Sequence, residues 1–355
     1  MIAFPLQYSN FLCGNKTSLQ SNDDDEVNKK LHSFKDRHYT ASSMTLVVQS
    51  QETIGTLEKM VLSSFTDVPN NGLEKETIMD FFSTFDLGEF HKLVKVQTLT
   101  DYYKLDLHWM LRPLHKEFKC KPLAYLAKMV GHESEGSLAE FLRQKSWAVR
   151  VYANANTREN DMNDYTTHSE FEVSIDLTKS GFEAFDQVCS AVFSYLKMLA
   201  HEGPKERIFN EIKEIKELQF KYRNEPDPDS NVEELSQSMQ KLPTEFLFTG
   251  SRLVYDYNPQ LIQECMDAVT PDKVCLVLSS NKFSNICDQT EPWNKAKYAL
   301  ENIPPKWEET WKNVEIYPEF NLPEPNIFIA KDVTLKAIEP TKVTALPERY
   351  VMFIY

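Results

Sequence analysis

The chain of 355 residues is long enough for two domains with a buried core. Its 39 lysines and arginines stand against 53 aspartates and glutamates, and the net charge of −14 disfavours contact with a nucleic-acid backbone while favouring basic peptides. No stretch reaches the roughly 18 apolar residues of a membrane span, and the first residues lack the apolar run of a signal peptide. We therefore expect a cytoplasmic globular protein that binds neither nucleic acid nor membrane.

The cysteines support this expectation, because none belongs to a C-x-x-C motif. They are scattered through segments with helix or strand character, as reduced and mostly buried thiols would be. The six positions are Cys13, Cys120, Cys189, Cys265, Cys275 and Cys287.

A first group of elements is expected before residue 90. Apolar periodicity predicts helices over 27–39 and 52–65, and β-branched residues predict a strand over 44–48. The sequence P-N-N-G at 69–72 then breaks the chain, and a linker is expected over about 70–90.

A second group alternates strands with longer helices. Strands are expected over 93–97, 104–111, 147–154, 171–177 and 274–279, and helices over 182–199, 205–222, 231–240 and 260–269. The spacing lacks the regular strand–helix–strand period of a doubly wound sheet. We predict an α+β fold in which helices are layered on a mainly antiparallel sheet.

Within this group, the segment Pro122–Asn154 reads as helix, tight connector, helix and strand. Leu123, Leu126 and Val130 share one face of the first helix. The connector G-H-E-S-E-G-S begins at Gly131, which is expected to end that helix with a positive φ. The second helix follows Ser137, and the strand follows Trp147.

This segment resembles the second, non-catalytic domain of the insulysin/pitrilysin family, the zinc peptidases with an inverted zinc motif. The family pattern G-H-E-G-x-G-S-[LI]-x-x-x-L-[RK]-x-x-x-W is kept except at Ser134, where the family has glycine. Segments 44–50, 69–73, 193–199 and 203–209 resemble the dibasic-selective branch of that family, and the resemblance covers roughly residues 10–340. The matching motif residues are Gly131, His132, Glu133, Gly136, Ser137, Leu138, Leu142, Arg143 and Trp147.

The resemblance implies zinc chemistry, yet the chain lacks the residues for it. In the family, two histidines of an H-x-x-E-H motif lie one helical turn apart and bind zinc, and the glutamate between them is the general base. This chain has eight histidines, and no two are four positions apart. The stretch Gly14–Leu19 resembles one that follows the zinc motif, so the catalytic residues would precede Met1. We expect no catalytic residue, no bound zinc and no peptide hydrolysis here.

The resemblance also implies a place where substrate is held. In family members the strand after the tryptophan offers its edge to the amino-terminal part of the substrate, which adds to the sheet as a further strand. Ala153 and Asn154 stand where the family has two glycines, and their side chains would crowd an incoming backbone. An ordinary sheet strand fits the pattern equally well. The candidate exosite residues are Tyr152, Ala153, Asn154, His132 and Glu133.

Three regions are expected. Residues 1–75 resemble the end of the first, zinc-type domain, residues 76–300 the second domain, and residues 301–355 an extended, truncated connector. We expect a non-cleaving part of a zinc metalloendopeptidase that binds peptides, with dibasic sites as the substrate of the family branch. Two alternatives stay open: an interaction or regulatory protein that pairs with a full-length relative, and a piece of an active enzyme.

Overall fold

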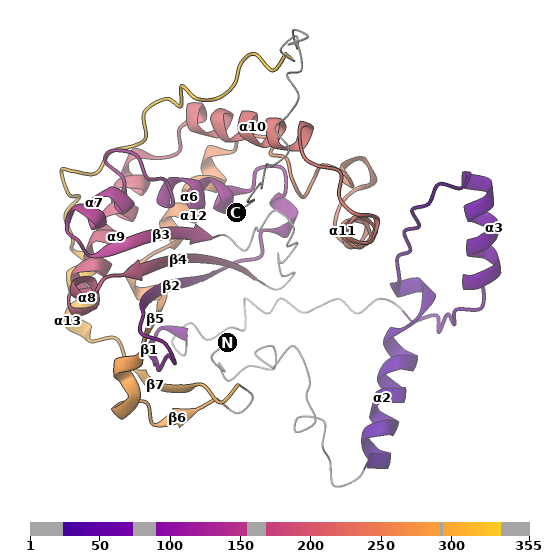
Figure 1. Cartoon of the computed structure of the whole chain (residues 1–355), viewed down its shortest axis with the longest axis horizontal. Coiled ribbons are helices and arrows are strands. Elements are labelled where there is room, and N and C mark those ends of the chain that lie inside the picture. The colour runs from indigo at the N-terminus through magenta and orange to yellow at the C-terminus, as the bar shows by residue number, and fades with distance from the viewer. Residues whose placement is uncertain (1–23, 74–89, 155–167, 292–293, 335–355) are drawn as a thin grey trace, which may run out of the picture.

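The computed structural model describes residues 24–73, 90–154, 168–291 and 294–334. Its centre is a seven-stranded sheet with the order β3-β4-β2-β5-β1-β7-β6, in which the β1–β5 pair runs parallel and the other pairs run antiparallel. The predicted α+β fold with a mainly antiparallel sheet is confirmed (Figure 1). The strands are β1 (Leu93–Val96), β2 (Tyr103–Leu111), β3 (Ala148–Asn154), β4 (Ser169–Leu177), β5 (Val274–Ser280), β6 (Gln289–Thr290) and β7 (Lys297–Glu301).

Helices cover one face of this sheet. In Figure 1, α6 (Pro122–Val130), α7 (Leu138–Gln144), α9 (Phe185–Glu202) and α12 (Pro259–Ala268) gather on that face. Alternate residues of β2 point into this layer because successive side chains of a strand face opposite ways. Leu105, Leu107 and Trp109 are therefore fully buried, and the Trp109 ring lies 5.8 Å from that of Phe171 and 6.2 Å from that of Phe193.

Four further helices lie around this core. They are α8 (Lys179–Glu183), α10 (Glu206–Lys221), α11 (Pro228–Lys241) and α13 (Pro305–Lys312). The helix expected over 182–199 is in fact two helices, which meet at Ala184, the residue that ends α8 and precedes α9. No helix of the described residues is long and apolar enough to cross a membrane. The five described cysteines are free thiols, and four of them are buried, as expected.

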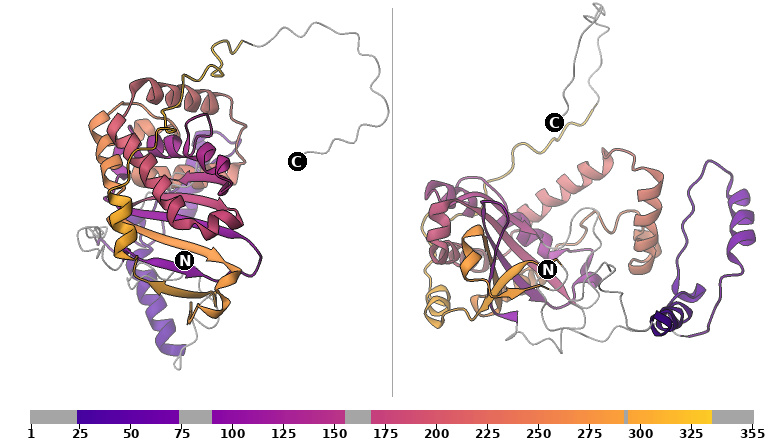
Figure 2. Two further views of the ribbon diagram at one scale, coloured as in Figure 1. Left: turned by 90° about the vertical axis from the view of Figure 1, so that its left-hand side faces the viewer. Right: turned by 60° about the horizontal axis from the view of Figure 1, so that its bottom comes forward.

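The first described segment stands apart from the sheet, as Figures 1 and 2 show. It contains α2 (Asp24–His38) and α3 (Ile54–Phe65), and neither helix has a buried residue. The prediction of a strand over 44–48 is wrong, because the backbone there has no strand partner among the described residues. A β-branched segment needs a neighbouring strand to complete its hydrogen bonds, and propensity alone does not supply one.

The end of the described chain also differs from expectation. The region 301–355 is expected to be an extended connector, but it includes α13, whose Trp311 is buried against α9. Two further strands, β6 and β7, were not expected from the sequence. β6 has two residues and β7 has five, of which only Ala299 is buried, and β7 is held in place by its pairing with β1.

Candidate peptide-binding site

The outer edge of β3 is the feature that the sequence singled out. β3 lies at the end of the sheet and pairs with β4, and no other described strand pairs with it. The register between the two strands shifts between Ala148 and Arg150, a bulge that leaves Val149 58% exposed. A strand at a sheet edge keeps backbone N–H and C=O groups that a further strand can use.

A cavity of about 630 Å³ opens beside this edge. Tyr152, Ala153, Asn154 and Glu133 line it, so the structure brings together four of the five predicted site residues. The other walls come from α6, α10, α11 and the loop before α12, which lies over 250–254. The walls on α10, α11 and this loop were not predicted, because their residues follow β3 by some 60 to 100 positions.

Gly131 brings the connector close to β3. It ends α6, but its φ is −89°, so the expectation of a positive φ was wrong. A Cβ at this position would lie 3.1 Å from the carbonyl oxygen of Ala127 and 3.4 Å from the backbone nitrogen of Ala153. Glycine is favoured here because the chain of the connector approaches the strand closely.

Gly136 serves the turn itself. Its φ is +77°, and its carbonyl oxygen accepts a hydrogen bond of 3.0 Å from the backbone N–H of Asn321. Ser137 then caps α7, because its Oγ accepts from the N–H of Glu140 at 3.1 Å. These contacts fix the connector between α6 and α7, and thereby the side of the cavity on which Glu133 lies.

His132 is the predicted site residue that does not line the cavity. Its Nε2 lies 2.7 Å from the hydroxyl of Tyr195, which donates to the carbonyl oxygen of Met129, and its Nδ1 lies 2.9 Å from Oγ of Ser134. Burial and the charge of Lys128 lower the pKa of His132 to about 4. The side chain is therefore neutral near pH 7 and joins the connector to α9.

Glu133 faces the cavity from an exposed position. Its Oε2 accepts a hydrogen bond of 2.9 Å from Nη2 of Arg143, and the two side chains are 63% and 45% exposed. A pair this exposed contributes little to stability. Its main effect is to neutralise the negative charge of Glu133 at the mouth of the cavity.

The side chains of β3 leave the strand edge accessible in the plane of the sheet. Val151 is buried, Tyr152 is 48% exposed, and Ala153 and Asn154 are half-buried. Side chains of a strand project above and below the sheet, whereas an added strand would approach along the edge. Ala153 packs against the main core, which takes its methyl group away from the edge.

The residues described here do not fit a zinc centre of the family type. One group of three potential ligands gathers on the open face of the sheet: Asp106, His108 and Glu172. It holds one histidine, not two, and Asp106 already accepts hydrogen bonds from Ser174 (2.6 Å) and Lys104 (2.8 Å). This group therefore lacks the two-histidine ligand set of the family's zinc site.

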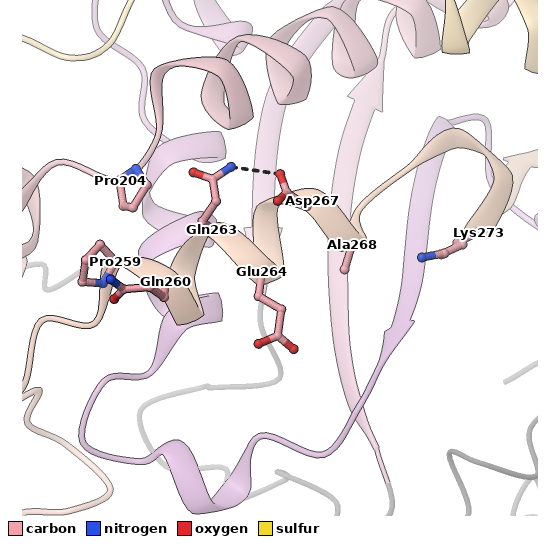
Figure 3. Close-up of a pocket in the computed structure, with 8 residues that line it drawn as sticks. All are labelled: Pro204, Pro259, Gln260, Gln263, Glu264, Asp267, Ala268 and Lys273. Carbon is pink, nitrogen blue, oxygen red and sulfur yellow. Dashed lines mark hydrogen bonds between the residues drawn. The ribbon is translucent and has the colours of Figure 1, made fainter.

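A second depression lies on α12 and contains none of the predicted site residues (Figure 3). Three of its polar side chains are engaged locally, since Gln263 donates to Asp267 at 2.9 Å and Glu264 accepts from Arg112 at 2.7 Å. The cavity beside β3 is therefore the better candidate.

Comparisons with known proteins assign both parts of the chain to one peptidase family. A family model described as the inactive domain of peptidase M16 matches residues 27–216. A model described as the middle or third domain of peptidase M16 matches residues 220–351. The central sheet takes β1 to β4 from the first matched segment and β5 to β7 from the second.

Individual relatives are similar over most of this chain. Human nardilysin is 38% identical over 330 residues, which cover 91% of this chain and 28% of the relative. The insulin-degrading enzyme of Drosophila melanogaster is 30% identical over 327 residues, which cover 91% of this chain and 32% of the relative. The crystal structure of pitrilysin shares the fold, with a TM-score of 0.77 and 22% identity over 86% of this chain and 32% of that one. The chain thus spans about a third or less of the length of these relatives.

Proposed function

Because the chain belongs to the peptidase M16 family and matches its inactive-type domain over residues 27–216, we propose that it is a non-cleaving, peptide-binding part of a nardilysin-like metalloendopeptidase. The observation that carries the proposal is the outer edge of β3 beside a cavity of about 630 Å³. A peptide in extended conformation would add to β3 as a further strand, and its side chains would enter the cavity.

The backbone of the peptide provides the sharpest test of this binding mode. We expect an eight-residue peptide to bind in a fluorescence-anisotropy titration. Its counterpart, N-methylated at alternate residues on the edge that would face β3, should bind about tenfold more weakly, because each lost hydrogen bond costs about 1 kcal/mol. Equal affinity of the two peptides would contradict strand addition.

A pair of substitutions on β3 tests the location. Tyr152→Ala removes an exposed aromatic ring from the cavity lining and should weaken binding about fivefold. Val149→Ala is the matched control, because Val149 lies on the same strand, is 58% exposed and does not line the cavity. If both variants bind like the parent chain, the site lies elsewhere.

Absence of cleavage is the second part of the proposal. Incubation with a fluorogenic dibasic peptide, with and without added zinc, should release no product, because no two histidines of the chain are four positions apart. Cleavage that a chelator abolishes would overturn this part. Zinc binding and dibasic selectivity belong in this proposal to a complete family member, and the cytoplasmic location remains a prediction.

Pairing with a full-length relative is the second candidate function. It is supported by the apolar surface of α3, on which Ile54 is 85%, Met60 52% and Leu62 55% exposed. Co-purification with a full-length relative at a fixed stoichiometry would support it. If α3 variants with Met60→Lys and Leu62→Lys co-purify equally well, this surface does not make the contact.

A further inference from the structure

The cavity beside β3 carries a charge opposite to that of the chain. Among the described lining residues there are six cationic side chains and two carboxylates, a surplus of four positive charges, whereas the whole chain has a net charge of −14. The cationic side chains are Lys121, Lys128, Lys216, Arg223, Lys241 and Arg252, and the carboxylates are Glu133 and Glu234.

Both carboxylates of the lining are already engaged by arginines. Glu234 accepts a hydrogen bond of 2.9 Å from Nε of Arg252, and Glu133 accepts one of 2.9 Å from Arg143, which lies outside the lining. A ligand cation that entered the cavity would have to compete with these guanidinium groups. A ligand carboxylate would instead meet Lys128 at the end of α6 and Arg223 after α10, both of which are exposed.

The local charge decides which peptide is favoured. At physiological ionic strength the screening length is about 8 Å, so charges on distant surfaces contribute little inside the cavity. The net charge of −14, from which basic peptides are expected, is therefore a poor guide to this site. The charge of Lys128 acts on its surroundings, since it contributes to the lowered pKa of His132.

The cavity also has an apolar component. Val151, Ile212, Ile215 and Phe220 contribute to its lining beside the basic side chains, and Val151 and Ile212 are buried. In an extended peptide, alternate side chains point to opposite sides. A peptide with alternating character can therefore direct apolar side chains to these residues while its other side chains reach the basic rim, which consists of the exposed Lys128 and Arg223.

We propose that the cavity beside β3 selects extended peptide segments in which acidic and apolar residues alternate. The proposal rests on the peptide-binding function proposed above and adds the substrate class to it. An extended nucleic-acid strand is the other anionic ligand, but its backbone lacks the alternating N–H and C=O groups that pair with the edge of a strand.

Three matched peptides test the proposal in fluorescence-anisotropy titrations with the full chain. All have valine at alternate positions, and the remaining positions are glutamate, glutamine or lysine. We expect the glutamate peptide to bind at least tenfold more tightly than the lysine peptide, with the glutamine peptide between them. The preference should shrink as the salt concentration is raised from about 50 to about 500 mM, because salt screens the attraction between exposed charges.

Substitutions at the rim locate the preference. Lys128→Gln and Arg223→Gln should each weaken binding of the glutamate peptide about threefold and leave the glutamine peptide unchanged. Lys306→Gln is the control, because Lys306 is an exposed cation on α13 outside the lining and its removal changes the net charge equally.

The outcomes separate the two proposals. If none of the three peptides binds, the peptide-binding function itself fails. If the glutamine or lysine peptide binds as tightly as the glutamate peptide, or if Lys306→Gln has the same effect as the rim variants, peptide binding stands and the acidic preference is wrong. Equal affinity for a single-stranded oligonucleotide would show that the cavity recognises anions generally, and would overturn the assignment to peptides.

Discussion

His132 stands in the connector between α6 and α7, and both of its ring nitrogens have hydrogen-bond partners. Tyr195 has one hydroxyl hydrogen, which it donates to Met129, so Nε2 of His132 carries a proton and donates to Tyr195. Nδ1 then accepts from Ser134, the residue at which the chain departs from the family pattern. This histidine therefore acts by holding the connector against α9.

The low pKa of His132 predicts a pH dependence of stability. The pKa is about 4 in the folded chain and about 6.5 in the unfolded chain, so the unfolded chain binds the proton more tightly. The neutral His132 side chain therefore stabilises the folded chain fully above about pH 6.5, and this contribution is lost as the pH falls through 4. Between pH 7 and 4.5 the parent chain should lose about 2 kcal/mol more free energy of unfolding than His132→Gln.

Urea denaturation of both chains at the two pH values measures this difference. Other titrating groups are the same in both chains and cancel in the comparison. An equal loss in the parent and the variant would mean that His132 is solvated and titrates normally.

At the scale of elements, α13 shows how the end of the described chain joins the core. The indole of Trp311 is 2% exposed, its Nε1 donates to the carbonyl oxygen of Asp186 at 3.2 Å, and its ring lies 5.4 Å from that of Phe193. Asp186 and Phe193 belong to α9. The helix therefore belongs to the same packed body as α9, although the two come from different matched segments of the family.

Truncation of this side chain should be costly. Trp311→Ala is expected to lower the free energy of unfolding by about 3–5 kcal/mol, because it leaves a large cavity and the carbonyl of Asp186 without its donor. Trp307→Ala, one helical turn earlier and only half-buried, should cost clearly less. Guanidinium denaturation monitored by far-UV circular dichroism measures both. A loss below 1 kcal/mol for Trp311→Ala would show that α13 detaches in solution.

The elements that could be predicted are those whose pattern is local. Leu105, Leu107 and Trp109 alternate and face the helices in β2, and the apolar stripe of 122–130 forms α6, because each pattern matches the period of its element. The strand over 44–48 failed for the opposite reason, since a strand is completed by a partner elsewhere. The walls of the cavity on α10 and α11 could not be predicted, because tertiary packing brings them to β3.

The candidate site also combines features that a local pattern predicts with features that only tertiary packing creates. Tyr152, Ala153, Asn154 and Glu133 could be chosen from sequence because they lie in one continuous segment. The positive charge of the cavity could not be predicted from sequence, because four of its six cations lie far from this segment, between residues 216 and 252. Composition gave the opposite expectation, since it averages over all surfaces of the chain.

At the scale of the whole molecule, the segment 24–73 is attached to the rest by few contacts. Among the described residues, its polar links to α11 include hydrogen bonds from Thr45 to the carbonyl oxygen of Ser236 (3.0 Å), from Gln240 to Thr45 (3.0 Å) and from Asn231 to Gln49 (2.6 Å). Within the segment, the end of α2 is joined to residue 71, because the side chain of Asn71 donates to the carbonyl oxygens of Asp36 and Arg37. Without a buried apolar face, α2 and α3 gain little from tertiary packing, which normally supplies most of the stability of a helix.

Hydrogen exchange should reveal this difference in the intact chain. Amides of α3 are expected to exchange at least a hundredfold faster than those of α9, whose Val188, Ala191 and Tyr195 are fully buried. Mass spectrometry of peptic fragments over seconds to hours measures both helices in one sample. If α3 is as protected as α9, its apolar side chains are covered in solution. A protection that falls on dilution would identify a second copy of the chain as the cover, and one that persists would require a contact within the chain itself.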